Sequence, residues 1–365
     1  MARDLDDTHD LTVAVEARAA YEMLMTLAAC AERGNADTFE IGPAWFARVE
    51  ALAGEDLLDR IDRLTAGCGW VFGHILGLAI DTPEPRDGPA FVDHVRAAAP
   101  RDLHLALVGH TLRPFRRATP PEVMTAAIAG DRAARRAFEA SSFPDHPTWP
   151  GALHGLLGME SDEVGALLQG IVADWQERAF ANEAMALMPL AERDAAEKQA
   201  LLGTLGGSRV IDLATRGWDY VPEPGVTRVI LAPSVVQRPW NVTADHGGTR
   251  IFCYSVADET IAAVTGDPPA FLIRRLKALS DERRLRILRR LVAERLSLVE
   301  LAKEFGLPKT TIHHHLGILR AAGLIHLRDE PGRQYSPFPR YAYRVEAIPA
   351  AMEALEAYLS LEEDR

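Results

Sequence analysis

The sequence predicts a mainly α-helical protein with a small antiparallel β-sheet, divided into more than one domain. Three observations lead to this fold class. Segments rich in Ala, Leu, Met and Glu follow one another through the first 206 residues and are separated by Pro and Gly. Residues typical of strands gather only after Gly206, around 217–257. The length of 365 residues exceeds the usual size of one domain.

Composition limits the class of protein and its compartment. The N-terminal stretch "MARDLDDTHD" is acidic and has no apolar run, so we expect no secretory signal. The most apolar window, 67–80, is too short to span a bilayer, which predicts no membrane association. Cys30, Cys68 and Cys253 lie far apart and fit reduced thiols. We therefore expect a cytoplasmic protein.

The elements follow in order along the chain. A first helix is expected over 12–33 and a long one from Ser161, bent or broken near Pro189. "VTRVILAPSVV" and "TRIFCYSVA" then supply strands of the small antiparallel sheet. The expected divisions are a flexible N-terminus at 1–10, a helical domain at 11–206, a β region at 207–265, a further domain at 266–345 and a last helix at 346–365.

Charge is distributed unevenly. The whole chain has a formal net charge of −12, but residues 267–345 hold 16 Lys and Arg against 8 Asp and Glu. The remainder holds 24 against 44. Affinity for phosphate depends on local charge, so this basic domain fits a nucleic-acid partner better than the overall charge suggests.

The basic domain begins with helices whose apolar faces can be read directly. A helix over about 269–279 places Leu272, Leu276 and Leu279 on one face. Ser280 is a candidate cap for the next helix. The apolar face of that helix, which is expected to pack against the core, consists of Leu285, Leu288 and Val292. "SLVE" at 297–300 is a capping box that starts a third helix, which Gly306 ends.

A fourth helix opens at Pro308, only two residues after Gly306, and stops at Gly323. Two helices joined by so short a turn form a helix-turn-helix. Ile312, Leu316 and Leu319 recur at helical spacing and should face the core. Alternation in "LIHLRD" and "RQYSPF", on either side of "EPG", predicts a β-hairpin. The domain at 266–345 is therefore expected to be a winged helix-turn-helix, with Arg333 just past the wing tip.

The last helix carries an apolar stripe of its own, formed by Ile348, Met352, Leu355 and Leu359. An exposed stripe at this spacing favours a partner helix, so we expect a homodimer.

The run "LKALSDERRLRILRRL", followed by "LSLVELAKEFGLPKTTIHHHLGILRAAGLIHLRDEPGRQY", resembles the winged helix-turn-helix of ArsR-type (arsenic-repressor-like) bacterial transcription regulators. The resemblance covers roughly 267–345. It implies a homodimeric DNA-binding regulator that represses transcription from a pseudo-palindromic operator. The long preceding segment resembles, more vaguely, the N-terminal extension of some members.

The outward face of the fourth helix supplies the candidate contacts with double-stranded DNA. Lys309 and Thr310 are placed for phosphate, and Thr311 for base or phosphate. His313 and His314 occupy positions where the family places base-reading side chains, with solvated spectators as the alternative. His315 borders the apolar stripe and is expected to be packed and hydrogen-bonded. The DNA-binding residues are thus expected to be Lys309, Thr310, Thr311, His313, His314, Arg320 and Arg333.

Other functions receive less support. Three consecutive histidines point about 100° apart on a helix and cannot converge on one metal ion, so no metal or cofactor is expected. No catalytic motif is present, so we expect no enzyme activity. A winged helix used for protein binding remains the alternative. The segment before the basic domain is expected to sense an unidentified small molecule or to bind a partner. In it, His74, His104 and His110 lie in apolar contexts typical of core histidines.

Overall fold

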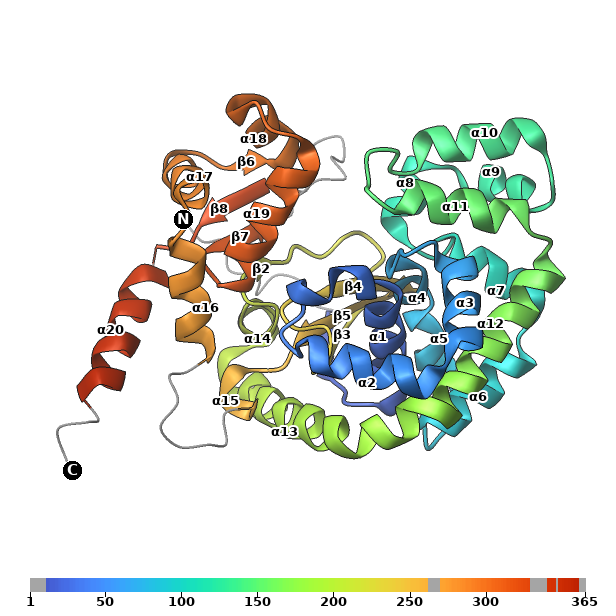
Figure 1. The fold of residues 1–365 in the computed structure, drawn as a ribbon, viewed down its shortest axis with the longest axis horizontal. Coiled ribbons are helices and arrows are strands. Elements are labelled where there is room, and N and C mark those ends of the chain that lie inside the picture. The colour runs from blue at the N-terminus through green and yellow to red at the C-terminus, as the bar shows by residue number, and fades with distance from the viewer. Residues whose placement is uncertain (1–10, 262–269, 329–339, 346, 361–365) are drawn as a thin grey trace. The chain divides into compact units, whose positions relative to one another are not determined.

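The computed structural model describes residues 11–261, 270–328, 340–345 and 347–360. The chain forms two compact units (Figure 1). The large unit comprises Asp10–Gln199 and Gly225–Ser255. The C-terminal unit comprises, among the described residues, those at 200–224 and those from 256 onward. These units differ from the expected divisions, because the β region at 207–265 contributes its strands to both of them.

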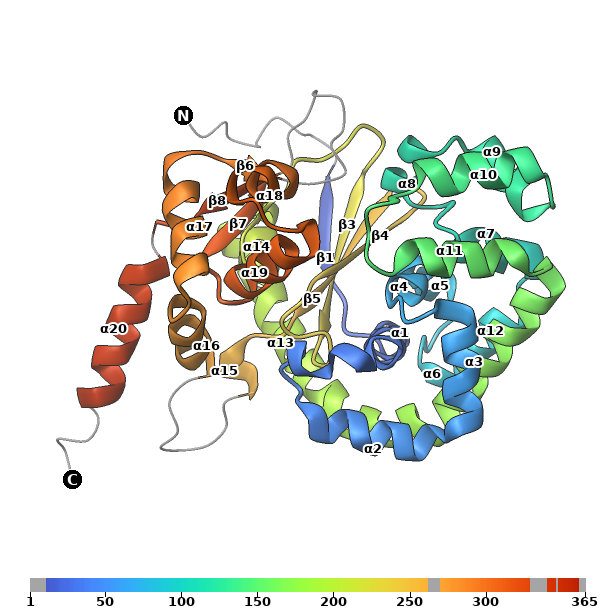
Figure 2. The ribbon, with the colours of Figure 1, turned by 45° about the horizontal axis from the view of Figure 1, so that its top comes forward.

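The sheet of the large unit has four strands in the order β1-β3-β5-β4 (Figure 2). They are β1 (Thr12–Val15), β3 (Arg228–Ser234), β4 (Val242–His246) and β5 (Thr249–Ser255). The expected small sheet is present, but its pairing is mixed: β1 and β5 both run parallel to β3, and only β4 and β5 are antiparallel. Residues 12–15 were expected to be helical. They form an edge strand instead, paired with residues 228–231. The sequence around 12–15 did not predict this strand, because its partner lies more than two hundred residues away in the chain.

Helices make up most of the large unit. Helix α1 is buried along almost its whole length and packs against β3, while α4 and α5 pack against β4. The helices are α1 (Ala19–Ala31), η2 (Arg33–Thr38), α2 (Pro43–Ala53), α3 (Glu55–Thr65), α4 (Trp70–His74), α5 (Leu76–Asp81), α6 (Gly88–Ala97), α7 (Pro100–Leu107), α8 (Arg113–Ala118), α9 (Pro121–Ile128), α10 (Arg132–Ser141), α11 (Trp149–Gly158), α12 (Ser161–Trp175), η3 (Gln176–Phe180) and α13 (Ala181–Leu205). Pro189 lies inside α13 without ending it.

Two of the three histidines singled out in this part of the sequence are core residues. His74 is 4% exposed and His104 is fully buried, and burial lowers the pKa of each imidazole to about 4. Both rings are therefore neutral at physiological pH. His110 is only half-buried and differs from the expectation.

The C-terminal unit combines a helical core with a second four-stranded sheet in the order β2-β7-β8-β6. Strands β7 and β8 pair antiparallel, as expected for the base of a wing, and β2 pairs parallel with β7. The elements are α14 (Gly207–Ala214), β2 (Trp218–Asp219), α15 (Asp258–Ile261), α16 (Ala270–Leu279), α17 (Glu282–Ala293), β6 (Leu296–Ser297), α18 (Leu298–Phe305), α19 (Lys309–Ala321), β7 (Ile325–Arg328), β8 (Arg340–Tyr343) and α20 (Ala347–Ser360).

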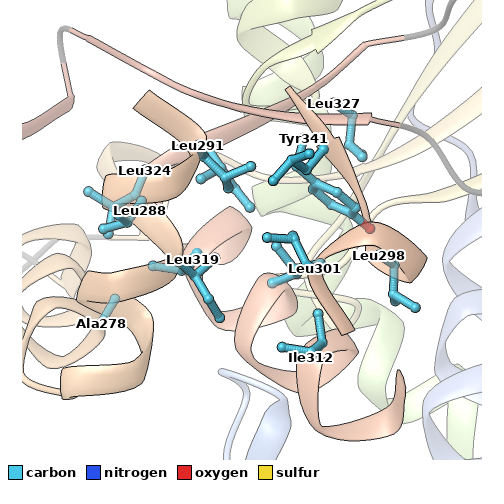
Figure 3. Packing of buried hydrophobic residues seen from close by; sticks show 14 of the residues in the cluster. Ala278, Leu288, Leu291, Leu298, Leu301, Ile312, Leu319, Leu324, Leu327 and Tyr341 are labelled. Carbon is cyan, nitrogen blue, oxygen red and sulfur yellow. The ribbon is translucent and has the colours of Figure 1, made fainter. Parts of the chain in front are cut away.

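One apolar cluster holds α17, α18, α19 and the wing strands together (Figure 3). Leu301, Ile312 and Leu319 are fully buried within it. On α17 the inward residues are Ile287, Leu288 and Leu291. The expected stripe is wrong except for Leu288, because Leu285 and Val292 are 47% and 63% exposed.

The helix ends partly follow the sequence signals. Ser297 accepts from the Glu300 amide at 3.3 Å and the Glu300 carboxylate accepts from the Ser297 amide at 2.7 Å, which confirms the capping box. Helix α17 is capped by Asp281, whose carboxylate accepts from the Arg284 amide at 2.9 Å, and not by Ser280. Either side chain suits a cap, so the sequence alone does not distinguish them.

Candidate nucleic-acid interface

Helices α18 and α19 are joined by a turn of three residues. Gly306 ends α18 with a φ of 63°, in the left-handed region that glycine occupies at low cost. The Leu307 amide donates to the Ala302 carbonyl at 3.1 Å, and Pro308 then caps α19. This turn holds α19 against α18 and fixes which of its faces points outward.

The two faces of α19 differ as the spacing predicts. Ile312, Leu316 and Leu319 are at most 1% exposed and belong to the apolar cluster. The opposite side carries exposed Thr310, His313 and His314. Lys309 and Thr311, at the start of the helix, are half-buried. These five side chains carry hydrogen-bonding groups or charge suited to base edges and phosphates.

The three consecutive histidines have different environments. His315 is 7% exposed, and neither of its ring nitrogens has a hydrogen-bond partner within the described part of the chain. Its expected burial is present, but the expected hydrogen bond is not seen. Desolvation lowers the pKa of His315 despite the nearby Asp281 carboxylate, which favours the neutral ring. The exposed rings of His313 and His314 are the ones that can meet a partner.

The environment of His313 disfavours its charged form. The side chain is exposed in area, yet the protein around the ring desolvates it and lowers its pKa, and Arg320 and His314 add to that effect. A neutral imidazole still offers one donor and one acceptor for base edges.

Arg320 departs from the expected outward orientation. Its guanidinium lies over the Trp218 ring at 5.5 Å from the ring centroid, and its Nη2 atom is buried without a hydrogen-bond partner among the described residues. A cation over an indole face is an attractive pair that holds the side chain within the unit. Trp218 stands far upstream in the sequence, so no local pattern could have revealed this contact. Arg333, the other arginine of the expected set, lies outside the described residues.

Many arginines of the basic domain are engaged with carboxylates. Arg286 pairs with Glu282 at 2.5 Å, and Arg290 pairs with both Glu294 and Glu304 at 2.7 Å. The sequence count of positive charge therefore overstates the charge that α17 presents.

The described residues show neither a metal centre nor a membrane span. No group of three or more His, Cys, Asp or Glu side chains in the described chain is placed to hold a metal ion. Within the same residues, no helix has the length and apolar character needed to cross a bilayer.

Comparison with known families agrees with this geometry. Residues 279–328 match a family model described as a helix-turn-helix domain, a range that runs from the end of α16 through α17, α18, α19 and β7. No curated protein and no solved structure matches the chain. The C-terminal unit thus contains a helix-turn-helix domain of the kind found in DNA-binding transcription regulators.

Proposed function

We propose that the protein is a sequence-specific, ligand-responsive transcription repressor of the ArsR type that binds a pseudo-palindromic operator as a cytoplasmic homodimer in a bacterium. The observation that carries the DNA-binding part is the division of α19 into a buried apolar face and an exposed face with Thr310, His313 and His314. Such a helix enters the major groove with its N-terminal residues against base edges. Repression rests on the family resemblance alone.

The homodimer rests on α20. Met352 and Leu359 are 40% and 59% exposed on this helix, while Ala347 and Ala351 on the same helix are buried. Large apolar side chains left in water favour a partner surface. Replacing Met352 and Leu359 by Glu should convert a dimer into a monomer in sedimentation experiments, with operator affinity falling at the same time. A dimer that survives both changes would move the interface away from α20.

The experiment that tests the DNA-binding proposal compares two variants on DNA from the promoter of the chain's own gene. Lys309→Ala should weaken binding by about 1 kcal/mol for all sequences and reduce the salt dependence, because a phosphate contact carries no base information. His314→Ala should instead relax base preference, by about 1–3 kcal/mol at one position. Identical specificity profiles for the two variants would contradict this division of roles.

The alternative function is a winged helix that binds protein. It predicts no affinity for any duplex even at low salt, so the same titration distinguishes the two functions. We further propose that the chain acts by binding alone and not as an enzyme. Incubation with a panel of metabolites should give no turnover.

A further inference from the structure

We propose that a basic cleft beside α8 in the large unit binds a small organic anion carrying several phosphate or carboxylate groups. The anion site stands on the geometry of the large unit. Only its effect on DNA binding rests on the function proposed above. For the ligand-responsive regulator proposed above, the cleft identifies the chemical class of the ligand as an anion with several charged groups.

The cleft has a volume of about 470 Å³, within the range of small-molecule sites. Among the described residues, its lining contains no Asp or Glu, although the sequence of the large unit holds 30 Asp and Glu against 20 Lys and Arg. Cationic and hydrogen-bonding side chains predominate in the lining, which includes His110, Thr111, Arg113, Arg116, Arg117 and the turn at Gly247. A concave surface whose described lining is cationic, on a unit with an excess of acidic residues, favours anions as ligands.

Arg113 is held in place by a buried carboxylate behind it. Asp245 is 2% exposed, and its Oδ2 accepts from the Arg113 amide at 3.0 Å. Its Oδ1 lies 3.7 Å from the Arg113 Nε and 2.8 Å from the Arg250 Nε. The Arg113 Nη2 also donates to the Gly225 carbonyl at 2.9 Å. One carboxylate thus contacts two guanidinium groups, and its hydrogen bond to the Arg113 amide helps to fix the position of Arg113 beside the cleft.

Arg116 and Arg117 add exposed charge within one turn of Arg113. The structure gives Arg116 no ion-pair partner among the described residues. Desolvation lowers the pKa of the adjacent His110, and Arg116 lowers it further, so an empty cleft disfavours another positive charge. Guanidinium groups suit phosphate and carboxylate because their donors match those oxygens in pairs.

The base of α8 is rigid. Phe115 is 5% exposed, and its ring lies 4.6 Å from His74 and 5.2 Å from Trp149 between ring centroids. Trp70 contacts the same ring at 6.2 Å. A Cβ added at Gly109, where φ is +85°, would lie 2.7 Å from Phe115. The arginines are therefore presented from a fixed support that contacts two tryptophans, so tryptophan fluorescence can report binding.

The test is calorimetric titration of the full-length protein with pyrophosphate and, separately, with citrate. Binding at one saturable site is expected for at least one probe, with a change in tryptophan fluorescence. The double variant Arg116→Ala/Arg117→Ala should weaken it at least tenfold. The matched control is Arg132→Ala/Arg136→Ala, which removes the same charge from exposed positions on α10 and should leave the affinity unchanged.

The possible outcomes test the anion site and the proposed regulatory function separately. No saturable binding of either probe, or equal weakening by the control, would overturn the anion site. Operator affinity measured with and without the bound probe then tests regulation: a change supports the ligand-responsive regulator, and no change removes the regulatory role of the cleft. If the protein bound the anion but no duplex, the site would stand and the proposed function would fail.

Discussion

The two units differ in the polar groups that they bury. The large unit encloses Asp, Glu, Lys, Arg and His side chains that are at most 9% exposed, namely Glu22, His74, His104, Glu183, Asp194, Lys198, Arg238, Asp245 and Arg250. In the described part of the C-terminal unit, the buried polar side chains are Thr215, Thr260, Ser297 and His315. In the C-terminal unit, the charged side chains thus lie mainly on the surface of an apolar core. The large unit has charged and polar side chains in its interior.

Several of these buried charges are paired, as the free-energy cost of burying charge requires, whereas the Glu22 Oε2 atom has no hydrogen-bond partner among the described residues. The Asp194 carboxylate accepts from the Tyr254 hydroxyl at 2.6 Å and from the Lys198 ammonium at 3.0 Å. The Glu183 carboxylate accepts from the Trp45 indole at 2.8 Å. This difference indicates that pH acts most directly on the stability of the large unit, whereas apolar packing determines the stability of the C-terminal unit.

The largest expected effect is the loss of stability when a buried leucine of the C-terminal unit is shortened. Leu316→Ala should destabilise the C-terminal unit by about 2–5 kcal/mol, because it opens a cavity where the side chain is 1% exposed. Leu285→Ala, at a leucine that is 47% exposed on α17, should cost less than about 1 kcal/mol. Urea unfolding followed by circular dichroism measures both. Equal losses would mean that the inward face of α17 is wrongly assigned.

A second effect concerns the buried carboxyl of Glu22. Its Oε1 accepts from the Val235 and Val236 amides at 3.0 and 3.1 Å, and burial raises the pKa to about 7 from an ordinary value of 4.5. The folded unit therefore holds a proton that the unfolded chain releases above pH 4.5. Stability falls as the pH rises from there through 7, by up to about 3 kcal/mol.

Glu22→Gln keeps an acceptor for both amides and removes the ionisation. The variant should exceed the parent in stability by about 1–3 kcal/mol at pH 8 and lose that advantage at pH 5. Thermal unfolding at both pH values measures the difference. His74 and His104 destabilise both proteins equally below pH 6.5, so they cancel in the comparison. An advantage that does not change with pH would show that Glu22 is not protonated in the fold.

A smaller effect tests the helix caps of the C-terminal unit. Ser297→Ala breaks the capping box of α18 and should cost about 1 kcal/mol. Ser280→Ala is the control, since Asp281 caps α17 and the Ser280 hydroxyl donates only to the Lys277 carbonyl. The two free energies of unfolding, measured in urea, should differ by most of that amount. A greater loss for Ser280→Ala would reverse the assignment of caps.

The smallest effect is the pH dependence of DNA affinity. A protonated imidazole can add a phosphate contact, and the pKa of His313 lies below its ordinary value. Affinity should therefore rise a few-fold as the pH falls, mainly toward pH 6 and below, and should do so less in a His313→Ala/His314→Ala variant. Fluorescence anisotropy with a labelled duplex measures it. Affinity that does not vary with pH would remove protonation from the mechanism and leave DNA binding intact.

How far the sequence could predict the fold depended on the distance between partners. The capping box at Ser297, the turn at Gly306 and the inward face of α19 are encoded within a few residues, and the structure contains all three. The parallel pairing of Thr12 with Arg228 depends on residues far apart in the chain and left no local pattern. On α17, the expected and observed stripes share Leu288 and both have helical spacing, so periodicity could not choose between them.

The candidate interface shows the same limit. The exposure of His313 and His314 follows from the position of the apolar stripe, so it was predictable. The position of Arg320 over Trp218 depends on a segment about one hundred residues upstream, and it was not. The ion pairs of Arg286 and Arg290 also neutralise part of the positive charge of α17, which a count of Lys and Arg in the sequence does not show.

Strand β2 has a practical consequence for anyone who wishes to study the DNA-binding part alone. Trp218 and Asp219 cover one side of β7, so a fragment that starts near residue 270 would leave the amide and carbonyl groups of that strand open to other molecules. Such a shortened polypeptide should self-associate through its bare sheet edge. A fragment joined to residues 200–224 through a short linker should remain dispersed.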